Sequence, residues 1–288
     1  MRNIPGYERF PAGEIDLDRP NLARIYDYYL GGTANYAVDR VFAEKALEQF
    51  PFVRPASQSN RLFLHRAVRH LIKRGIRQFV DIGSGVPTMG CTHQVADELT
   101  DDARVCYIDN EPVAVAHSRI LLEDHGDLDR HTVVQADLRD TEALWDKVAD
   151  TGIIDTTQPL ALMMIAVLHV TQPDDTGADI GPQVVAEHRD MMPSGSYLVF
   201  SHGTADGVPE GRARQMAEFG AMYDKTATPV IWRPRAEIEE FFGDLELIEP
   251  GATWTPLWHP EERGPSSPDI EFDDPSDSVV WAGVAYKP

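Results

Sequence analysis

The chain has 288 residues and carries 47 acidic against 26 basic side chains, which gives a formal net charge of −21 at pH 7. This charge would repel a phosphate backbone, so we expect no nucleic-acid partner and find a small neutral or cationic ligand easier to reconcile with the sequence. The two cysteines have no metal-ligand spacing, and no stretch approaches the roughly 20 apolar residues of a membrane span, which predicts a cytoplasmic protein with no metal and no membrane partner.

The first quarter of the sequence is predicted to be mostly helical. Residues 1–19 are polar and rich in Pro, Gly and Asp, which indicates an irregular leader. Three helical patterns follow, each stopped by Gly or Pro, at residues 20–30, 38–50 and 57–74. We therefore expect a helical cap over residues 20–75, ahead of a second unit over residues 76–288.

From Ile76 onward, short β-rich runs alternate with helical patterns, which is the signature of consecutive β-α-β units in a parallel sheet. The runs lie at residues 77–81, 104–109, 131–135, 160–169 and 196–202. Helices are expected at residues 92–99, 111–124, 141–149, 181–192, 210–223 and 235–242. Two further runs, at residues 246–249 and 279–286, flank a Pro-rich loop over residues 250–278. An α/β fold with a seven-stranded sheet follows from this count.

The strongest motif is FVDIGSG at residues 79–85, where an acid ends a buried strand and Gly-x-Gly follows. Glycines outside the carboxyl end of such a strand let the backbone approach a ligand closely. A dinucleotide fingerprint needs a third glycine where Thr88 stands, so a pyrophosphate site is disfavoured. The carboxylate of Asp81 instead suits a ligand with an ammonium and a sulfonium group, such as S-adenosylmethionine. The alternative is that Gly83 and Gly85 only form a strand-to-helix turn.

Acidic residues also follow the next two strands. Asp109 ends the second strand, where an acid in a nucleotide-binding sheet accepts hydrogen bonds from ribose hydroxyls. Asp137 follows the third strand and could accept a hydrogen bond from an adenine amino group. Alternatively, Asp109 is a helix N-terminal charge and Asp137 a loop carboxylate. Three acids after three successive strands favour a nucleoside site.

With these residues in place, the sequence resembles class I S-adenosylmethionine-dependent methyltransferases. It is most similar to an actinobacterial family of S-adenosyl methyltransferase-like proteins of uncharacterised substrate, through RPNLARIYDYYLGGTANYAVDR, RQFVDIGSGVPTMGCTHQVA and GSYLVFSH. The resemblance implies a Rossmann-like, mostly parallel sheet with an antiparallel final strand, sandwiched by helices. It also implies S-adenosylmethionine as cofactor, with contacts from Asp81, Gly83, Ser84, Gly85, Asp109, Asn110, Asp137 and Leu138. A Tyr-rich N-terminal segment with Tyr28, Gly31 and Gly32 is expected to lie over the cofactor.

Two histidines are candidates for proton transfer. Methyl transfer from a sulfonium is a displacement on an activated donor, so positioning can supply much of the acceleration and a base is optional. His169 and His202 are predicted to end the fourth and fifth strands at the rim of the site, where an imidazole could take a proton from the acceptor. The alternative is that each histidine only bonds backbone at a strand end.

Three other residues near the N-terminus carry open interpretations. Tyr26 and Tyr29 are spaced i, i+3 and are expected to pack their helix on the sheet. The alternative is that they form a lid or an aromatic wall for a cation. Arg61 could hold a carboxylate or cap its own helix. Neither role of Arg61 is favoured by the sequence.

Three functions are weighed against these features. A methyltransferase acting on a small molecule is expected, because of the glycine loop and the acids at the strand ends. A non-catalytic or regulatory protein that binds S-adenosylmethionine is the alternative, because no catalytic base stands out. An NAD-dependent oxidoreductase rests on Asp109 alone and lacks the third glycine. A homodimer is left open.

Overall fold

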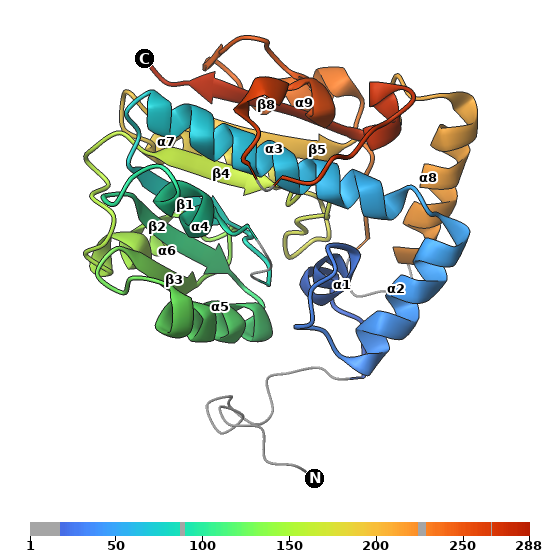
Figure 1. The fold of residues 1–288 in the computed structure, drawn as a ribbon, viewed down its shortest axis with the longest axis horizontal. Coiled ribbons are helices and arrows are strands. Elements are labelled where there is room, and N and C mark those ends of the chain that lie inside the picture. The colour runs from blue at the N-terminus through green and yellow to red at the C-terminus, as the bar shows by residue number, and fades with distance from the viewer. Residues whose placement is uncertain (1–17, 87–89, 224–228, 266) are drawn as a thin grey trace.

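The computed structural model describes residues 18–86, 90–223, 229–265 and 267–288 (Figure 1). The leader predicted at residues 1–19 therefore lies almost wholly outside the described residues. The described chain forms one sheet in the order β3-β2-β1-β4-β5-β8-β6, with β7 paired to β8. The parallel strands are β1 (Gln78–Ile82), β2 (Arg104–Asp109), β3 (His131–Gln135), β4 (Ala161–Ile165) and β5 (Tyr197–Gly203). The others are β6 (Glu246–Leu247), β7 (Thr253–Trp254) and the antiparallel β8 (Val280–Tyr286).

The predicted α/β fold class is confirmed, with two local differences. The loop expected over residues 250–278 contains β7 and three short 3-10 turns, so the described sheet has eight strands and not seven. The fourth strand is shorter than predicted and ends at Ile165. Ala166 has a φ of +57°, in the left-handed region, and turns the chain out of the strand. His169 therefore lies in the connection after β4 and not on the strand.

Helices cover both faces of the sheet. One face packs against α3 (Val53–Lys73), α4 (Thr92–Asp97) and α5 (Pro112–His125), and the other against α6 (Thr141–Asp150), α7 (Gly181–Met191) and α9 (Arg235–Glu240). Strand β1 is buried along its whole length, as expected for a parallel strand covered on both sides. The apolar runs that predicted the strands are therefore explained by this two-sided burial.

The remaining helices form a third cluster at one end of the sheet. These are α1 (Leu22–Tyr29), α2 (Ala37–Gln49) and α8 (Glu210–Tyr223). Figure 1 shows them beside the end to which the parallel strands point. The helix α3 begins in this cluster and continues over the sheet, where Phe63 and Leu71 are part of the sheet's own core. A helical cap thus remains a proposal for α1 and α2, whereas α3 also belongs to the layers of the sheet.

The strand order places a ligand site at this same end. The chain leaves β1 for β2 on one side and returns to β4 on the other, so β1 and β4 flank the point where the strand order reverses. In open α/β sheets, ligands bind outside the carboxyl ends of the strands at such a switch point. The residues that follow β1, β2 and β4 are therefore the ones that can reach a ligand.

Candidate functional site

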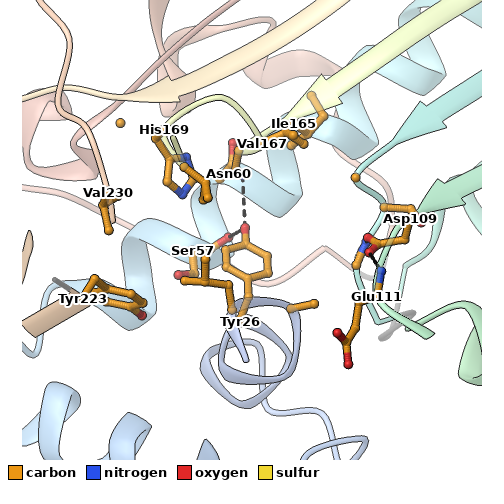
Figure 2. Close-up of a pocket in the computed structure, with 18 of the residues that line it drawn as sticks. Tyr26, Ser57, Asn60, Asp109, Glu111, Ile165, Val167, His169, Tyr223 and Val230 are labelled. Atoms are coloured by element: carbon orange, nitrogen blue, oxygen red, sulfur yellow. Dashed lines mark hydrogen bonds between the residues drawn. The ribbon is translucent and has the colours of Figure 1, made fainter. Parts of the chain in front are cut away.

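A cavity of about 490 Å³ lies at the carboxyl ends of β1, β2 and β4, and α1, α3 and α8 also contribute to its lining (Figure 2). Most of the predicted site residues line it: Asp81, Gly83, Ser84, Gly85, Asp109, Asn110, Leu138 and His169. The others are absent from its described lining: Asp137, Tyr28, Gly31, Gly32 and His202. The segment 81–85 thus borders a ligand-sized hollow, which the sequence interpretation requires.

The glycine loop is held in a conformation that side chains rarely adopt. Gly83 and Gly85 have φ values of +66° and +67°. The amide of Gly83 donates to the Ile108 carbonyl at 2.8 Å, and the amide of Gly85 donates to Oδ2 of Asp109 at 2.8 Å. A Cβ added to Gly83 would lie 2.5 Å from Cγ2 of Val167. The loop is therefore fixed between β2 and the connection after β4.

Gly83→Ala tests this close approach. We expect it to lower the free energy of unfolding by about 2–3 kcal/mol, because the left-handed backbone and the contact with Val167 both oppose a Cβ. Gly152→Ala is the matched control, since Gly152 has a φ of +65° but no atom within 4 Å of the added Cβ. Urea unfolding measures both. Val167→Ala added to Gly83→Ala should recover part of the loss, and equal costs for the two glycine variants would contradict the steric argument.

Asp81 is a buried acid that points to the cavity from the end of β1. Its Oδ2 accepts a hydrogen bond of 2.7 Å from Oγ1 of Thr92, which α4 supplies. Burial raises the pKa of Asp81 to about 6; the Thr92 bond and the charge of Arg61 act against this rise, and the carboxylate of Asp109 adds to it. A cationic group of a ligand would favour the ionised form of this acid.

Asp109 connects the loop after β2 to the glycine loop. Its Oδ2 accepts from the Gly85 amide, and its Oδ1 accepts from the Glu111 amide at 2.9 Å. Burial raises its pKa, and bonds from the backbone amides of Glu111, Gly85 and Asn110 lower it. Each oxygen of a carboxylate can accept a second hydrogen bond. Asp109 can thus receive ligand hydroxyls while it holds the loop.

Arg61 is a cation at the cavity wall, and its position in α3 excludes one of the two roles considered for it, that of a helix cap. It lies well inside α3, so it cannot cap this helix. Within residues 18–86, 90–223, 229–265 and 267–288, its guanidinium has no hydrogen bond or ion pair, although its charge acts on Asp81 and Tyr26. The hydroxyl of Ser84 also has no partner in this part of the chain. Both groups remain available to an anionic part of a ligand.

The N-terminal helix lies over the cavity, but through other tyrosines than expected. Tyr26 and Tyr29 line the cavity, because residues i and i+3 share one face of α1. The hydroxyl of Tyr26 accepts from Nδ2 of Asn60 at 3.0 Å and donates to the Ser57 carbonyl at 3.1 Å (Figure 2). Both tyrosines also pack in the cluster of α1, α2 and α8, so the pair combines the packing role with a place in the cavity wall.

Tyr28 and the two glycines after α1 are directed elsewhere. The hydroxyl of Tyr28 bonds Oε1 of Glu44 at the surface, at 3.1 Å. The amides of Gly31 and Gly32 donate to the carbonyls of Tyr28 and Asp27 and close the end of the helix. Their expected contact with the cofactor is thus not supported, because Tyr28 lies on the opposite face of α1 from Tyr26.

Asp137 is held by a neighbouring cation. Its Oδ2 pairs with Nη2 of Arg139 at 2.6 Å, and this hydrogen bond is the main cause of its lowered pKa. Its neighbours Ala136 and Leu138 line the cavity, whereas Asp137 does not. The expected bond from adenine to this carboxylate therefore finds no support in the geometry.

His202 is buried behind the cavity wall. Its Nδ1 lies 2.7 Å from the Gly203 carbonyl, and its Nε2 lies 2.9 Å from the Leu168 carbonyl and 3.1 Å from Nη1 of Arg233. Burial, together with the neighbouring His169, lowers its pKa to about 3, so the ring is neutral at pH 7. Both nitrogens are occupied, so the structure does not support His202 as a base.

His169 differs from His202 in its position and in its hydrogen bonding. It lines the cavity, and neither of its ring nitrogens has a hydrogen-bond partner in the described parts of the chain; Nδ1 is also fully buried. Burial, with a contribution from Arg233, lowers its pKa to about 4, so the ring is neutral at pH 7. His169 can therefore accept a proton or hydrogen bond from a ligand.

Among the described residues, no group of three or more His, Cys, Asp or Glu side chains is arranged to hold a metal ion. No helix in the same part of the chain is long and apolar enough to span a membrane.

The fold and the site define a Rossmann-like protein with an acidic, glycine-lined ligand cavity at the switch point of its sheet, as the resemblance to class I methyltransferases implies. The sequence matches the S-adenosyl methyltransferase family over residues 8–288, and the chain belongs to this family. It is therefore an S-adenosylmethionine-dependent methyltransferase, and the family leaves its substrate open. This assignment gives no support to the non-catalytic alternative or to an NAD-dependent oxidoreductase.

Solved structures agree with this assignment. A protein of Thermobifida fusca YX, provisionally described as a methyltransferase, is 34% identical with a TM-score of 0.81, over 97% of this chain and 99% of that chain. A DUF574 family protein of Streptomyces avermitilis MA-4680 is 34% identical with a TM-score of 0.80, over 94% of this chain and 98% of that chain. An O-methyltransferase family protein of Burkholderia thailandensis shares the fold alone. It is 12% identical with a TM-score of 0.50, over 82% of this chain and 60% of that chain. No curated protein sequence matches the chain.

Proposed function

We propose that the enzyme transfers the methyl group to a small molecule that shares the cavity with the cofactor. The observation that carries this proposal is the continuity of the cavity from the glycine loop to a second end between α1, α3 and α8. In Figure 2, Asp109 and Glu111 lie on one side of Tyr26, and His169, Val230 and Tyr223 lie on the other. A volume of about 490 Å³ is in the range of small-molecule sites.

The groups at the first end match the parts of S-adenosylmethionine. We assign the ammonium of its amino-acid end to Asp81 and the carboxylate to Arg61, because this acid and this cation reach the cavity near the glycine loop. The ribose hydroxyls are assigned to Asp109, and the adenine to the apolar wall at Ala136 and Leu138. When bound, the cofactor supplies the methyl group on an activated sulfonium.

The affinity for the cofactor should depend on pH through Asp81. In the free protein the pKa of Asp81 is raised to about 6, so below that pH the acid is neutral and cannot pair with an ammonium. We expect the dissociation constant to be constant between pH 7 and 7.5 and to rise about tenfold per pH unit as the pH falls below 6. Calorimetric titration with S-adenosylmethionine between pH 5 and 7.5 measures this.

Asp81→Asn is the control for this titration. It keeps an oxygen for the Thr92 hydroxyl but removes the charge, so it should weaken binding at pH 7.5 and flatten the pH dependence. Circular dichroism at each pH confirms that the protein stays folded. An unchanged slope in Asp81→Asn would show that another group binds the ammonium.

The protein's own part in the reaction is then mainly orientation and exclusion of water. Because the donor is activated, holding both reactants in line can supply most of the rate enhancement. Burial of Cys91 and Cys106 as free thiols supports the expectation of a reducing compartment, and we propose a cytoplasmic location. The acidic net charge and the small cavity both support the absence of a nucleic-acid substrate.

A further inference from the structure

We propose that the methyl acceptor is an uncharged, planar aromatic compound whose hydroxyl group faces His169. The second end of the cavity, here called the aromatic chamber, is formed by Tyr29, Phe52, Phe219, Tyr223 and Trp232. The proposal rests on the function proposed above, because it requires that acceptor and cofactor share the cavity.

The rings of the aromatic chamber come from three separated parts of the chain. The Phe219 ring lies 6.2 Å from Phe52 and 5.0 Å from Tyr223, both edge to face, and 6.3 Å from Trp232 in a stacked arrangement with an interplanar angle of 21°. The His169 ring also stacks on Trp232, with the ring centroids 6.2 Å apart and an interplanar angle of 21°. Aromatic ligands gain most from such offset-stacked and edge-to-face surfaces.

Polar atoms of the chamber are bonded within its own wall. The hydroxyls of Tyr29 and Tyr223 pair at 3.0 Å, and Nε1 of Trp232 donates to the Met216 carbonyl at 3.0 Å. The indole lies against Gly203, where an added Cβ would come within 2.5 Å of its ring. The chamber therefore offers a ligand fixed ring surfaces and few polar groups.

Charged side chains line the other parts of the cavity. Those in its described lining are Arg61, Asp81, Asp109, Glu111 and Arg139, and none belongs to the chamber. A charged acceptor would lose its hydration there without a counter-charge, which costs several kcal/mol. The absence of a carboxylate in the described chamber also argues against a cationic amine, although aromatic rings alone can attract cations.

The imidazole of His169, which has no hydrogen-bond partner in the described part of the chain, indicates the polar group of the acceptor. A buried imidazole without hydrogen-bond partners is rare in proteins, and here His202 beside it has both nitrogens occupied. A hydroxyl on a planar ligand stacked in the chamber would supply the missing partner. His169 is neutral at pH 7, so it can act as the acceptor of this bond.

The proposed step balances atoms and electrons without another reactant. A lone pair of the acceptor oxygen forms the O–CH3 bond while the C–S bond breaks, and the electron pair of that bond returns to sulfur to give neutral S-adenosylhomocysteine. The hydroxyl proton passes to the imidazole of His169, which returns it to water when the products leave.

Binding of matched probes to the enzyme saturated with S-adenosylhomocysteine tests the chemical class. We expect 2-naphthol to bind at least about tenfold more tightly than 2-naphthoate, 2-naphthylmethylammonium or the saturated decalin-2-ol. The first two would bury a charge without a counter-charge, and the saturated ring would lose the stacked and edge-to-face contacts with the chamber. Phenol and 9-phenanthrol extend the series to one and three rings. Tighter binding of a charged or saturated probe, or no binding of any of the three phenols, would overturn the proposal.

Two variants locate the probe. Trp232→Leu should abolish the preference for 2-naphthol, whereas Trp254→Leu, which removes a buried tryptophan outside the cavity lining, should leave it within about twofold. His169→Phe keeps a ring but no nitrogen, so it should retain 2-naphthol binding within about tenfold and lose methylation of 2-naphthol, followed by mass spectrometry, by a larger factor. Equal effects of the two tryptophan variants would contradict the chamber.

The same variants separate this inference from the function on which it rests. Trp232→Leu and His169→Phe should leave the affinity for S-adenosylhomocysteine unchanged, because they lie outside the part assigned to the cofactor. If 2-naphthol binds as predicted but S-adenosylhomocysteine has no effect on its binding and occupies another site, the proposal that acceptor and cofactor share the cavity is wrong. If the cofactor binds at Asp109 and only the probe preference fails, the acceptor class alone is wrong.

Discussion

Asp109→Ala should lower the affinity for S-adenosylmethionine about 100- to 1,000-fold. Two ribose hydroxyls bonded to one carboxylate contribute about 1.5–3 kcal/mol each, and a loss of about 3–4 kcal/mol corresponds to this factor. The variant also removes the acceptor for the amides of Gly85 and Glu111, so the glycine loop loses its anchor. Calorimetry with S-adenosylmethionine, together with circular dichroism to confirm folding, measures the effect.

Asp137→Ala is the matched control for this prediction. Both acids lie at the carboxyl ends of neighbouring parallel strands, but the carboxylate of Asp137 pairs with Arg139 and does not line the cavity. We expect its loss to change the affinity by less than about threefold, as for an exposed ion pair. If Asp137→Ala weakens binding as much as Asp109→Ala, the adenine contact predicted from the sequence is restored and the assignment of Asp109 loses its support.

Arg24→Met should lower the free energy of unfolding by about 3–5 kcal/mol, the usual effect of removing one partner of a buried ion pair. Nε of Arg24 lies 2.7 Å from Oδ2 of Asp39, and these side chains are 1% and 0% exposed. Nη1 of Arg24 also bonds Oε1 of Glu111 at 3.1 Å, so the same cation ties α1 to the loop after β2. Urea unfolding measures the loss.

Two further variants test the reason for this effect. Arg214→Met removes an arginine that is 72% exposed and lies 3.9 Å from Glu210, so it should change stability by less than about 0.5 kcal/mol. Asp39→Asn added to Arg24→Met removes the unpaired charge and should recover part of the loss. A cost below about 1 kcal/mol for Arg24→Met would mean that the buried pair does not hold α1.

The parts of this site that were predictable from the sequence depend on short segments. An acid and two glycines directly after a buried strand must lie at its carboxyl end, so Asp81, Gly83 and Gly85 could be placed before any contact was known. Asp109 followed in the same way, because β2 lies beside β1. Apolar periodicity likewise located the helices to within a few residues.

Other parts depend on partners from distant segments, which periodicity does not reveal. Leu168 and Arg233 surround His202 and exclude it from the cavity, whereas His169, predicted for the same role, has no hydrogen-bond partner among the residues that the structure describes. Tyr26 could be distinguished from Tyr28 only when α1 was seen docked over the site.

The sequence by itself determined the class of fold, the glycine loop and the acids at the strand ends, because these follow from backbone conformation and burial within one segment. Only the tertiary structure places Arg61 at the cavity wall, without a hydrogen bond or ion pair among the described residues, and lays Trp232 on Gly203 to close the aromatic chamber. Such contacts join residues far apart in the chain, and their free energies depend on which charges and rings the fold brings together.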